Sequence, residues 1–303
     1  MSTLINFENL NNTRDLGGMK TRDGRVIRSG RLIRSGQLYF ASEKDREMLT
    51  GLVGLIIDFR SDQEIHSKPD PFPGNDPASP LYMPLPILNA VTPGITKTEE
   101  AESRALEALM RDPDGAASYM IQTYRAFAAD TYIISRFEQF IRLLLKERDK
   151  AVLWHCTAGK DRSGFAAIII QEILGVDPGE ILEDYLATNV FLRREVDNLI
   201  QMIAGLRNQL SENAPSSQLS QDDSAAGSES SQPSQSDSAA GSESSLSAPS
   251  REALDALFTV REEYFLALYD EISLRFGNFD GFLRKGLHLS EEELARFREL
   301  YLL

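Results

Sequence analysis

The chain has 303 residues, of which 42% are hydrophobic and 26% charged, which suffices for one sizeable core or two small ones. Its formal net charge of −14 argues against nucleic acid and anionic membranes as partners. The single cysteine excludes an internal disulfide and a cysteine-cluster metal site, and it fits a reducing compartment.

The N-terminal part of the chain carries signals for short strands and one helix. It has neither the basic start nor the apolar core of a signal peptide, so we expect a cytoplasmic protein, with export by another route left open. No stretch reaches the roughly 18 apolar residues of an integral membrane segment. The pattern predicts a hairpin turn at Asp23-Gly24, short strands at 26–27 and 32–33, a helix over 42–52 capped by Ser42, and a buried strand over 55–60.

The middle of the chain changes from an irregular to a helical pattern. Residues 67–97 are rich in proline and glycine, and we expect them to be irregular. Helical spacing of apolar residues then predicts helices near 98–111, 115–129 and 131–148.

Residues 154–164 contain the only cysteine of the chain, and their sequence is Trp-His-Cys-Thr-Ala-Gly-Lys-Asp-Arg-Ser-Gly. Five residues separate Cys156 from Arg162. The apolar run 151–154 predicts a buried strand, and the pattern of 165–174 predicts a buried helix that ends near Gly175. We therefore expect a strand, a loop and a helix. The loop amides would point towards the helix N-terminus, where partial positive charge collects and a phosphate fits.

This loop combines a nucleophile with anion-binding groups. A helix N-terminus and a nearby cation favour the thiolate form of cysteine, so Cys156 is expected to attack phosphorus. The planar fork of Arg162 suits two phosphoryl oxygens, and Ser163 is expected to donate a hydrogen bond to the cysteine sulfur. The residues expected to line the bound phosphate are Thr157, Ala158, Gly159, Lys160 and Gly164. The alternative is a structural cysteine buried in a turn.

The C-terminal part divides at a serine-rich segment. Residues 211–250 hold 16 serines and six acidic residues, and a nonapeptide at 223–231 recurs identically at 237–245. Such a composition predicts a disordered insertion. Helices are predicted near 178–188, 190–210, 251–276, 279–285 and 290–302. Alternating strands and helices predict one α/β domain, 1–210 plus 251–303, with a parallel central sheet flanked by helices.

Separated stretches of the chain resemble the bacterial atypical protein-tyrosine phosphatases related to the secreted lipid-and-protein phosphatases of mycobacteria and Listeria. The stretches that carry the resemblance are 12–18 with 32–36, then 57–61, and the active loop 155–164. The resemblance implies a cysteine-dependent phosphatase fold, a phosphoprotein or phosphoinositide substrate, and no metal or other cofactor. Ser163 stands where the family more often has threonine, which keeps the hydroxyl. The segment 211–250 is not a feature expected of the family.

Two aspartates are candidates for the general acid that protonates the leaving oxygen. Asp161 is the first, because the resemblance to lipid phosphatases places an acid inside the loop itself. Asp58 is the second, because the carboxyl ends of parallel strands surround active sites. The alternative for Asp58 is a loop-capping carboxylate paired with Arg60.

The remaining charged residues have two interpretations each. Lys160 matches a lysine of phosphoinositide phosphatases and would face extra phosphates on an inositol ring, or it would be a solvent-exposed lysine. His155 is expected to order the loop. Four further residues either brace the loop or reach the substrate phosphate, and bracing is the commoner outcome: they are Arg14, Asp15, Arg34 and Arg60.

The sequence thus predicts an enzyme that hydrolyses phosphate monoesters through a phosphocysteine intermediate. Phosphotyrosine in proteins is the favoured substrate, and a phosphoinositide or dual-specificity phosphatase is the alternative. An inactive phosphate-binding module is the alternative from a different class. The sequence leaves the oligomeric state open.

Overall fold

The computed structural model describes residues 1–72, 79–87, 99–146, 148–212 and 249–303. Within these ranges one sheet has the strand order β1-β2-β3-β6-β4-β5. The strands are β1 (Thr3–Leu4), β2 (Arg14–Asp15), β3 (Leu32–Ser35), β4 (Val53–Asp58), β5 (Leu81–Pro84) and β6 (Ala151–His155). The neighbours β3, β6, β4 and β5 are parallel, whereas β1 and β2 add an antiparallel edge. The predicted α/β class is confirmed, and the antiparallel edge was not predicted.

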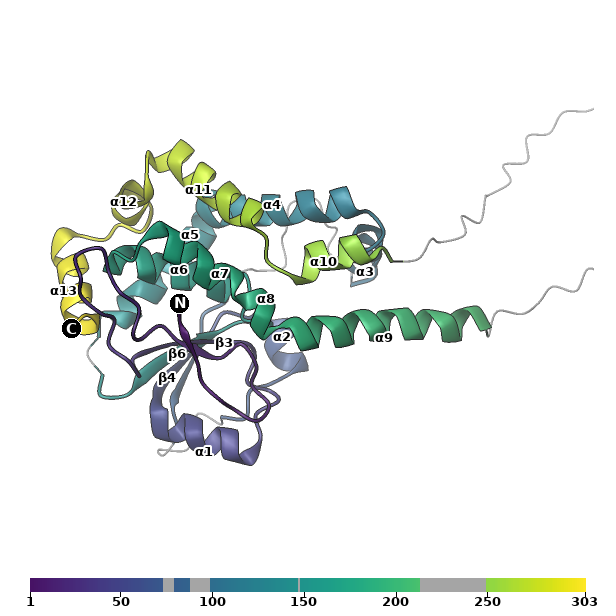
Figure 1. The fold of residues 1–303 in the computed structure, drawn as a ribbon, viewed down its shortest axis with the longest axis horizontal. Coiled ribbons are helices and arrows are strands. Elements are labelled where there is room, and N and C mark those ends of the chain that lie inside the picture. Colours follow the sequence, from purple (N-terminus) through teal and green to yellow (C-terminus); the bar gives the residue numbers. More distant parts are fainter. Residues whose placement is uncertain (73–78, 88–98, 147, 213–248) are drawn as a thin grey trace, which may run out of the picture.

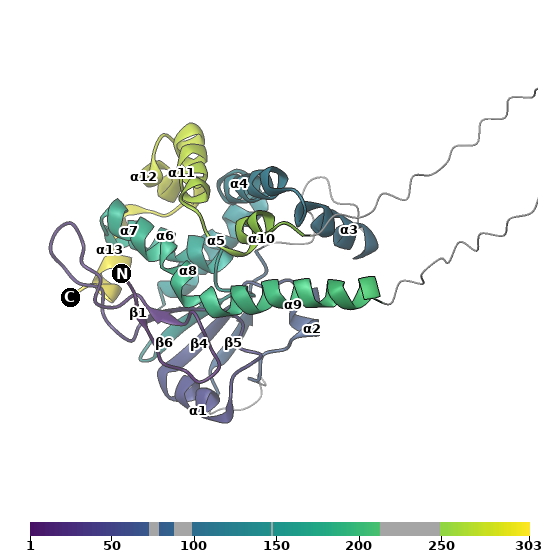
Figure 2. The ribbon, with the colours of Figure 1, turned by 45° about the vertical axis from the view of Figure 1, so that its right-hand side comes forward.

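Helices cover both faces of this sheet (Figures 1 and 2). Helix α1 lies against one face, and α5 and α6 lie against the other. The helices are α1 (Glu43–Leu52), α2 (Asp62–Ser67), α3 (Glu99–Leu109), α4 (Pro113–Ala129), α5 (Thr131–Leu144), α6 (Arg162–Leu174), α7 (Pro178–Leu186), α8 (Thr188–Phe191), α9 (Arg193–Glu212), α10 (Arg251–Phe258), α11 (Glu262–Phe276), α12 (Phe279–Gly281) with a π-helical turn (Phe282–Gly286), and α13 (Glu291–Tyr301). Ser42 caps α1 with a capping box, which confirms its predicted role.

The core explains why the central strands and α6 are apolar throughout. Along β6, Val152 and Trp154 join the larger core on the α6 side, while Leu153 joins the smaller core under α1. Helix α6 lies between the sheet and a second helical layer. Its Phe165 stacks on Phe127 of α4, with ring centroids 5.5 Å apart, and meets Phe137 of α5 edge-on. The sheet and the helices around it therefore hold α6, and the loop before it, in one place.

Two predicted elements differ from the structure. The segment 67–97, which was predicted to be irregular, contains β5. Two of its prolines, Pro80 and Pro84, argued against a strand in the sequence. The strand lies at the edge of the sheet, however, and an edge position tolerates proline. The helix predicted over 251–276 is broken between α10 and α11. There the backbone of Val260 exchanges two hydrogen bonds with the side chain of Asn189, so the chain leaves the helical path.

Smaller differences concern the N-terminal hairpin. A turn forms at Asp23-Gly24, where Gly24 has φ of +88°, and an isolated bridge joins Lys20 to Val26. Val26 and Ile27 do not form the predicted strand, because Ile27 pairs with Leu302 in a bridge of its own.

The predicted insertion lies mostly outside the described residues, and its edges need correction. Helix α9 continues through Glu212, so 211 and 212 belong to a helix. At the other edge Ser250 is the N-cap of α10, and its backbone amide donates to the Met110 carbonyl at 2.7 Å. The helix predicted near 190–210 is α9, which begins at Arg193, just after the short α8 ends at Phe191.

Candidate active site

Cys156 follows β6 directly, and Arg162 begins α6, so the predicted strand, loop and helix are all present. Cys156 is 3% exposed. Among the described residues, the backbone amides from Thr157 to Gly164 donate to no other protein group. Unpaired amides at a helix N-terminus form a binding site for an anion, and this one lies beside the Cys156 thiol.

Side chains from β3 and from the segment before β2 hold the loop backbone. The Asn12 amide donates to the carbonyls of Ala158 and Gly159 at 3.2 and 3.1 Å, and Arg34 donates to the Gly159 carbonyl at 2.9 Å. Gly159 has φ of +69°, and a Cβ there would lie 2.6 Å from backbone atoms of Ser35 and Gly36. The loop therefore lies directly against the end of β3, and only glycine fits at this position.

Arg34 braces the loop through its bond to Gly159, and Arg14 joins it in one network by pairing with the same carboxylate, that of Asp184. Arg14 is buried and pairs with Asp184 at 3.3 Å, and Arg34 lies 3.7 Å from the same carboxylate. Burial raises the pKa of Asp184, but the two guanidinium groups outweigh it and lower that pKa below its usual value. Asp15 accepts from the amides of Gly17 and Gly30 and so shapes the turn before β3.

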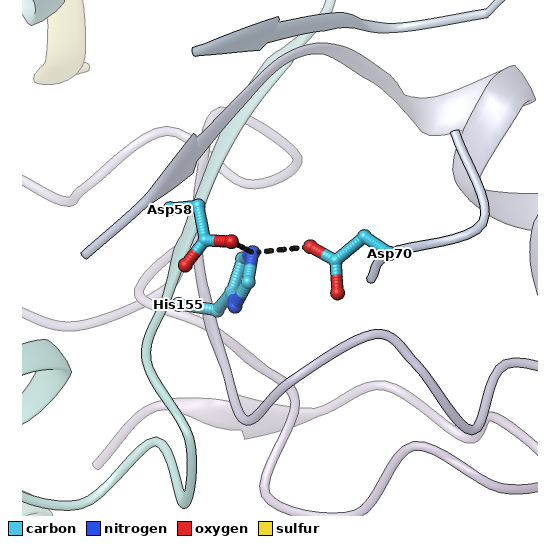
Figure 3. A group of neighbouring side chains, drawn as sticks. All are labelled: Asp58, Asp70 and His155. Atoms are coloured by element: carbon cyan, nitrogen blue, oxygen red, sulfur yellow. Dashed lines mark ion pairs between the residues drawn. The ribbon is translucent and has the colours of Figure 1, made fainter. Parts of the chain in front are cut away.

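A second buried network lies behind the loop, where β4 and β6 end (Figure 3). His155 forms ion pairs with Asp70 at 2.9 Å and with Asp58 at 3.7 Å, and Arg60 lies 2.7 Å from Asp58 and 2.9 Å from Asp70. Burial lowers the pKa of His155, but the charges of Asp70 and Asp58 outweigh it and raise that pKa. The imidazole Nδ1 lies 3.3 Å from the Cys156 carbonyl, which links the network to the loop.

The contacts of Asp58 match the alternative stated for it, a carboxylate paired with Arg60. Its side chain is fully buried, and it also accepts from the Tyr82 hydroxyl at 2.7 Å. Burial raises the pKa of Asp58, but His155 and Arg60 outweigh it and lower that pKa. Asp58, Asp70 and His155 place ligand atoms within 4.8 Å of one another, a grouping that could hold a metal ion. Arg60 already supplies the positive charge between both carboxylates, so we interpret the group as an ion-pair network.

Glu64 of α2 holds the guanidinium of Arg162. Its two oxygens accept from Nη1 and Nη2 of Arg162 at 2.8 Å each, and Nη1 also donates to the Phe59 carbonyl. Burial raises the pKa of Glu64, but the bonds to Arg162 outweigh it and lower that pKa to about 2. Within the described chain no group accepts from Nε, so that edge of the fork remains for a phosphate.

Sequence reasoning missed Glu64 and Asp70. Ser61 and Glu64 form a capping box at the start of α2, a pattern that is readable from sequence but indicates only a helix start. Nothing near Asp70 in the sequence marks it as a partner of His155.

Helices hold the side chains of Lys160 and Asp161. The Tyr124 hydroxyl of α4 donates to Asp161 Oδ1 at 2.8 Å. Lys160 is 4% exposed, and its ammonium donates to the carbonyls of Leu257 and Thr259, at 2.5 and 3.2 Å, where α10 ends. Of the two interpretations of Lys160, the solvent-exposed one is therefore wrong, and its charge is directed at a helix C-terminus.

Ser163 is buried, and its contacts differ from those expected. Its hydroxyl lies 3.4 Å from the Ser35 carbonyl, to which it donates, and its own carbonyl accepts from the Trp154 indole at 3.1 Å. In the described structure the hydroxyl is thus paired with the end of β3 and not with the cysteine sulfur.

Comparisons with known proteins agree with this geometry. A family model described as "Tyrosine phosphatase family" matches residues 5–303. The chain is 33% identical over 189 residues to a protein of Cupriavidus necator provisionally named a tyrosine-protein phosphatase, an alignment that covers 60% of this chain and 62% of that protein. It is 36% identical over 91 residues to the triple specificity protein phosphatase PtpB of Mycobacterium tuberculosis, which covers 29% of this chain and 32% of PtpB.

These alignments span less than two thirds of the relatives, whereas the family model spans nearly the whole chain. Among the described residues no helix has the length and apolar character needed to cross a membrane. The loop from Cys156 to Arg162, the groups that brace it and the match over 5–303 lead to one conclusion: the chain belongs to the tyrosine phosphatase family.

Proposed function

We propose that this protein hydrolyses phosphate monoesters through a phosphocysteine intermediate, with phosphotyrosine in proteins as the favoured substrate. The observation that carries the proposal is the set of unpaired amides from Thr157 to Gly164, with Cys156 beside it and Arg162 at its edge. The amides and the Nε edge of Arg162 would hold the three non-bridging oxygens as charge builds on them.

The reaction has two steps. In the first, the Cys156 thiolate forms an S–P bond while the bond from phosphorus to the leaving oxygen breaks, and Asp161 gives its proton to that oxygen. In the second, water attacks phosphorus, the S–P bond breaks, and the Asp161 carboxylate takes a proton from the water. A reducing compartment such as the cytoplasm would keep the thiol available.

Two observations bear on the substrate. One relative is named a triple specificity phosphatase, which supports a wider range than phosphotyrosine. Against a phosphoinositide, the Lys160 ammonium is bonded to the carbonyls of Leu257 and Thr259, so an inositol phosphate would have to displace them. We therefore keep phosphotyrosine as the favoured substrate and the phosphoinositide or dual-specificity activity as the alternative.

Phosphate release from a phosphotyrosine peptide tests the proposal, with phosphoserine, phosphothreonine and phosphoinositide substrates in parallel. The Cys156→Ser variant should show no turnover but still bind the peptide, because the amides and Arg162 remain. Arg162→Lys should lower kcat/KM by about 10²–10³-fold, since a point charge cannot replace a bidentate fork. A wild-type protein that binds the peptide without any turnover would instead be an inactive phosphate-binding module.

A further inference from the structure

Asp161 occupies the N-cap position of α6 but makes no capping bond to that helix. An aspartate at this position commonly accepts from an amide of the first turn. Here Oδ1 instead accepts from the Tyr124 hydroxyl at 2.8 Å, and Oδ2 lies 3.6 Å from the Lys160 ammonium. The carboxyl group is therefore oriented by a different helix from the one that it begins.

Tyr124 is itself held firmly. Its side chain is fully buried in α4, and its ring meets Tyr185 of α7 edge-on with centroids 6.0 Å apart. On another side it meets Tyr264 of α11 at 5.7 Å. Packed rings of this kind leave a tyrosine one orientation, so the direction of its hydroxyl is set before any substrate binds.

The hydroxyl also remains a donor over the working pH range. Burial and the charge of Asp161 raise the pKa of Tyr124 well above its usual value. The hydroxyl donates this proton to Oδ1 at 2.8 Å, which leaves Oδ2 as the oxygen that can carry the transferable proton.

We propose that Tyr124 is a positioning residue that directs Asp161 towards the leaving oxygen of the substrate. The proposal rests on the function proposed above. With Oδ1 bonded to Tyr124, the proton on Oδ2 passes to the leaving oxygen as the bond between that oxygen and phosphorus breaks. In the second step the same oxygen takes a proton from the attacking water.

The test compares two substrates in one enzyme sample, phenyl phosphate and 4-nitrophenyl phosphate. The first leaves as a poor anion and needs the acid, whereas the second barely does. Tyr124→Phe should slow phenyl phosphate hydrolysis about tenfold while 4-nitrophenyl phosphate changes less than about twofold, as expected when one hydrogen bond to the acid is lost. Because any misfolded fraction lowers both rates equally, their ratio reports positioning alone.

Tyr264→Phe is the matched control. It also removes a buried tyrosine hydroxyl, from the ring that packs against Tyr124, but this hydroxyl donates to the Ala256 carbonyl at 3.0 Å and not to Asp161. It should leave the ratio of the two rates unchanged. In an Asp161→Asn background, Tyr124→Phe should add no further change in the ratio, since the group that it directs is gone.

Three outcomes would overturn the proposal. Equal slowing of both substrates by Tyr124→Phe, or an undiminished change of ratio in the Asp161→Asn background, would refute the role of Tyr124 and leave the phosphatase activity standing. Absence of turnover in the wild-type protein would refute both. The role of Tyr124 would be established if Tyr124→Phe shifted the ratio in the wild-type protein but added no shift in the Asp161→Asn variant, and if Tyr264→Phe left the ratio unchanged.

Discussion

The loop from Cys156 to Arg162 is held through its backbone where it faces the sheet and through its side chains where it faces the helices. Asn12 and Arg34 bond to carbonyls of Ala158 and Gly159, and a Cβ on Gly159 would meet the end of β3. On the other side, Tyr124 and the end of α10 bond to the side chains of Asp161 and Lys160. The sheet thus sets the shape of the amide cradle, and the helices set the direction of the groups that would transfer protons or carry charge.

This difference predicts that changes on the sheet side cost more than changes on the helical side. Gly159→Ala should have the largest effect. Its Cβ would lie 2.6 Å from backbone of β3 and the residue after it, so the loop must move, and a displacement of about 1 Å can lower the rate by about 10²-fold. Steady-state kinetics with a phosphotyrosine peptide measures this. Gly24→Ala, at φ of +88° with nothing near its Cβ, carries the same backbone strain without the clash and should keep its activity.

Asp70→Asn tests the network behind the loop. It should lower the free energy of unfolding by about 2 kcal/mol at pH 6, as for a lost bond to a charged group. The pKa of His155 is raised in the folded protein, so the contribution of its charge is full below the ordinary value near ~6.5 and is lost as pH rises through the raised pKa. The loss measured by urea denaturation should therefore shrink between pH 6 and pH 9. A loss of constant size over that range would contradict the pairing of a charged His155 with Asp70.

Glu64→Gln should lower kcat/KM about tenfold, because a neutral amide holds the Arg162 fork less firmly than a carboxylate. The pKa of Glu64 is lowered to about 2, so its contribution to stability is full above the ordinary value of 4.5 and is lost as pH falls towards 2. The stability difference between wild type and variant should thus disappear over that window. Asp62→Asn, which also removes an acid from the first turn of α2, is the control and should leave kcat/KM unchanged.

Lys160→Met should have the smallest effect on turnover of an aryl phosphate, within about threefold, since its ammonium donates to the end of α10 and approaches Asp161 Oδ2 only at 3.6 Å. Its consequence should appear in hydrogen exchange, where the amides of α10 exchange faster once the end of that helix loses its cation. Lys150→Met removes an exposed lysine that donates to the Thr50 carbonyl and should leave α10 unaffected. If Lys160→Met instead abolished activity on phosphoinositides alone, the lysine would face the substrate.

Local patterns in the sequence determined the elements of the site. The spacing of five residues between Cys156 and Arg162, the apolar strand before them and the apolar helix after them predict the cradle, because these residues are neighbours along the chain. Ser42 likewise predicts a helix start from contacts within one turn. The mostly parallel sheet followed from the alternation of strands and helices.

Only the tertiary structure decided what surrounds those elements. Glu64 is 98 residues from Arg162, Tyr124 is 37 from Asp161, and Leu257 is 97 from Lys160. A charged side chain does not reveal from its type whether it faces solvent, a carboxylate or a helix end, because that depends on which distant element packs against it. The sequence therefore determined which groups carry the proposed chemistry, and the packing of α2, α4 and α10 against the loop decided how they are aimed.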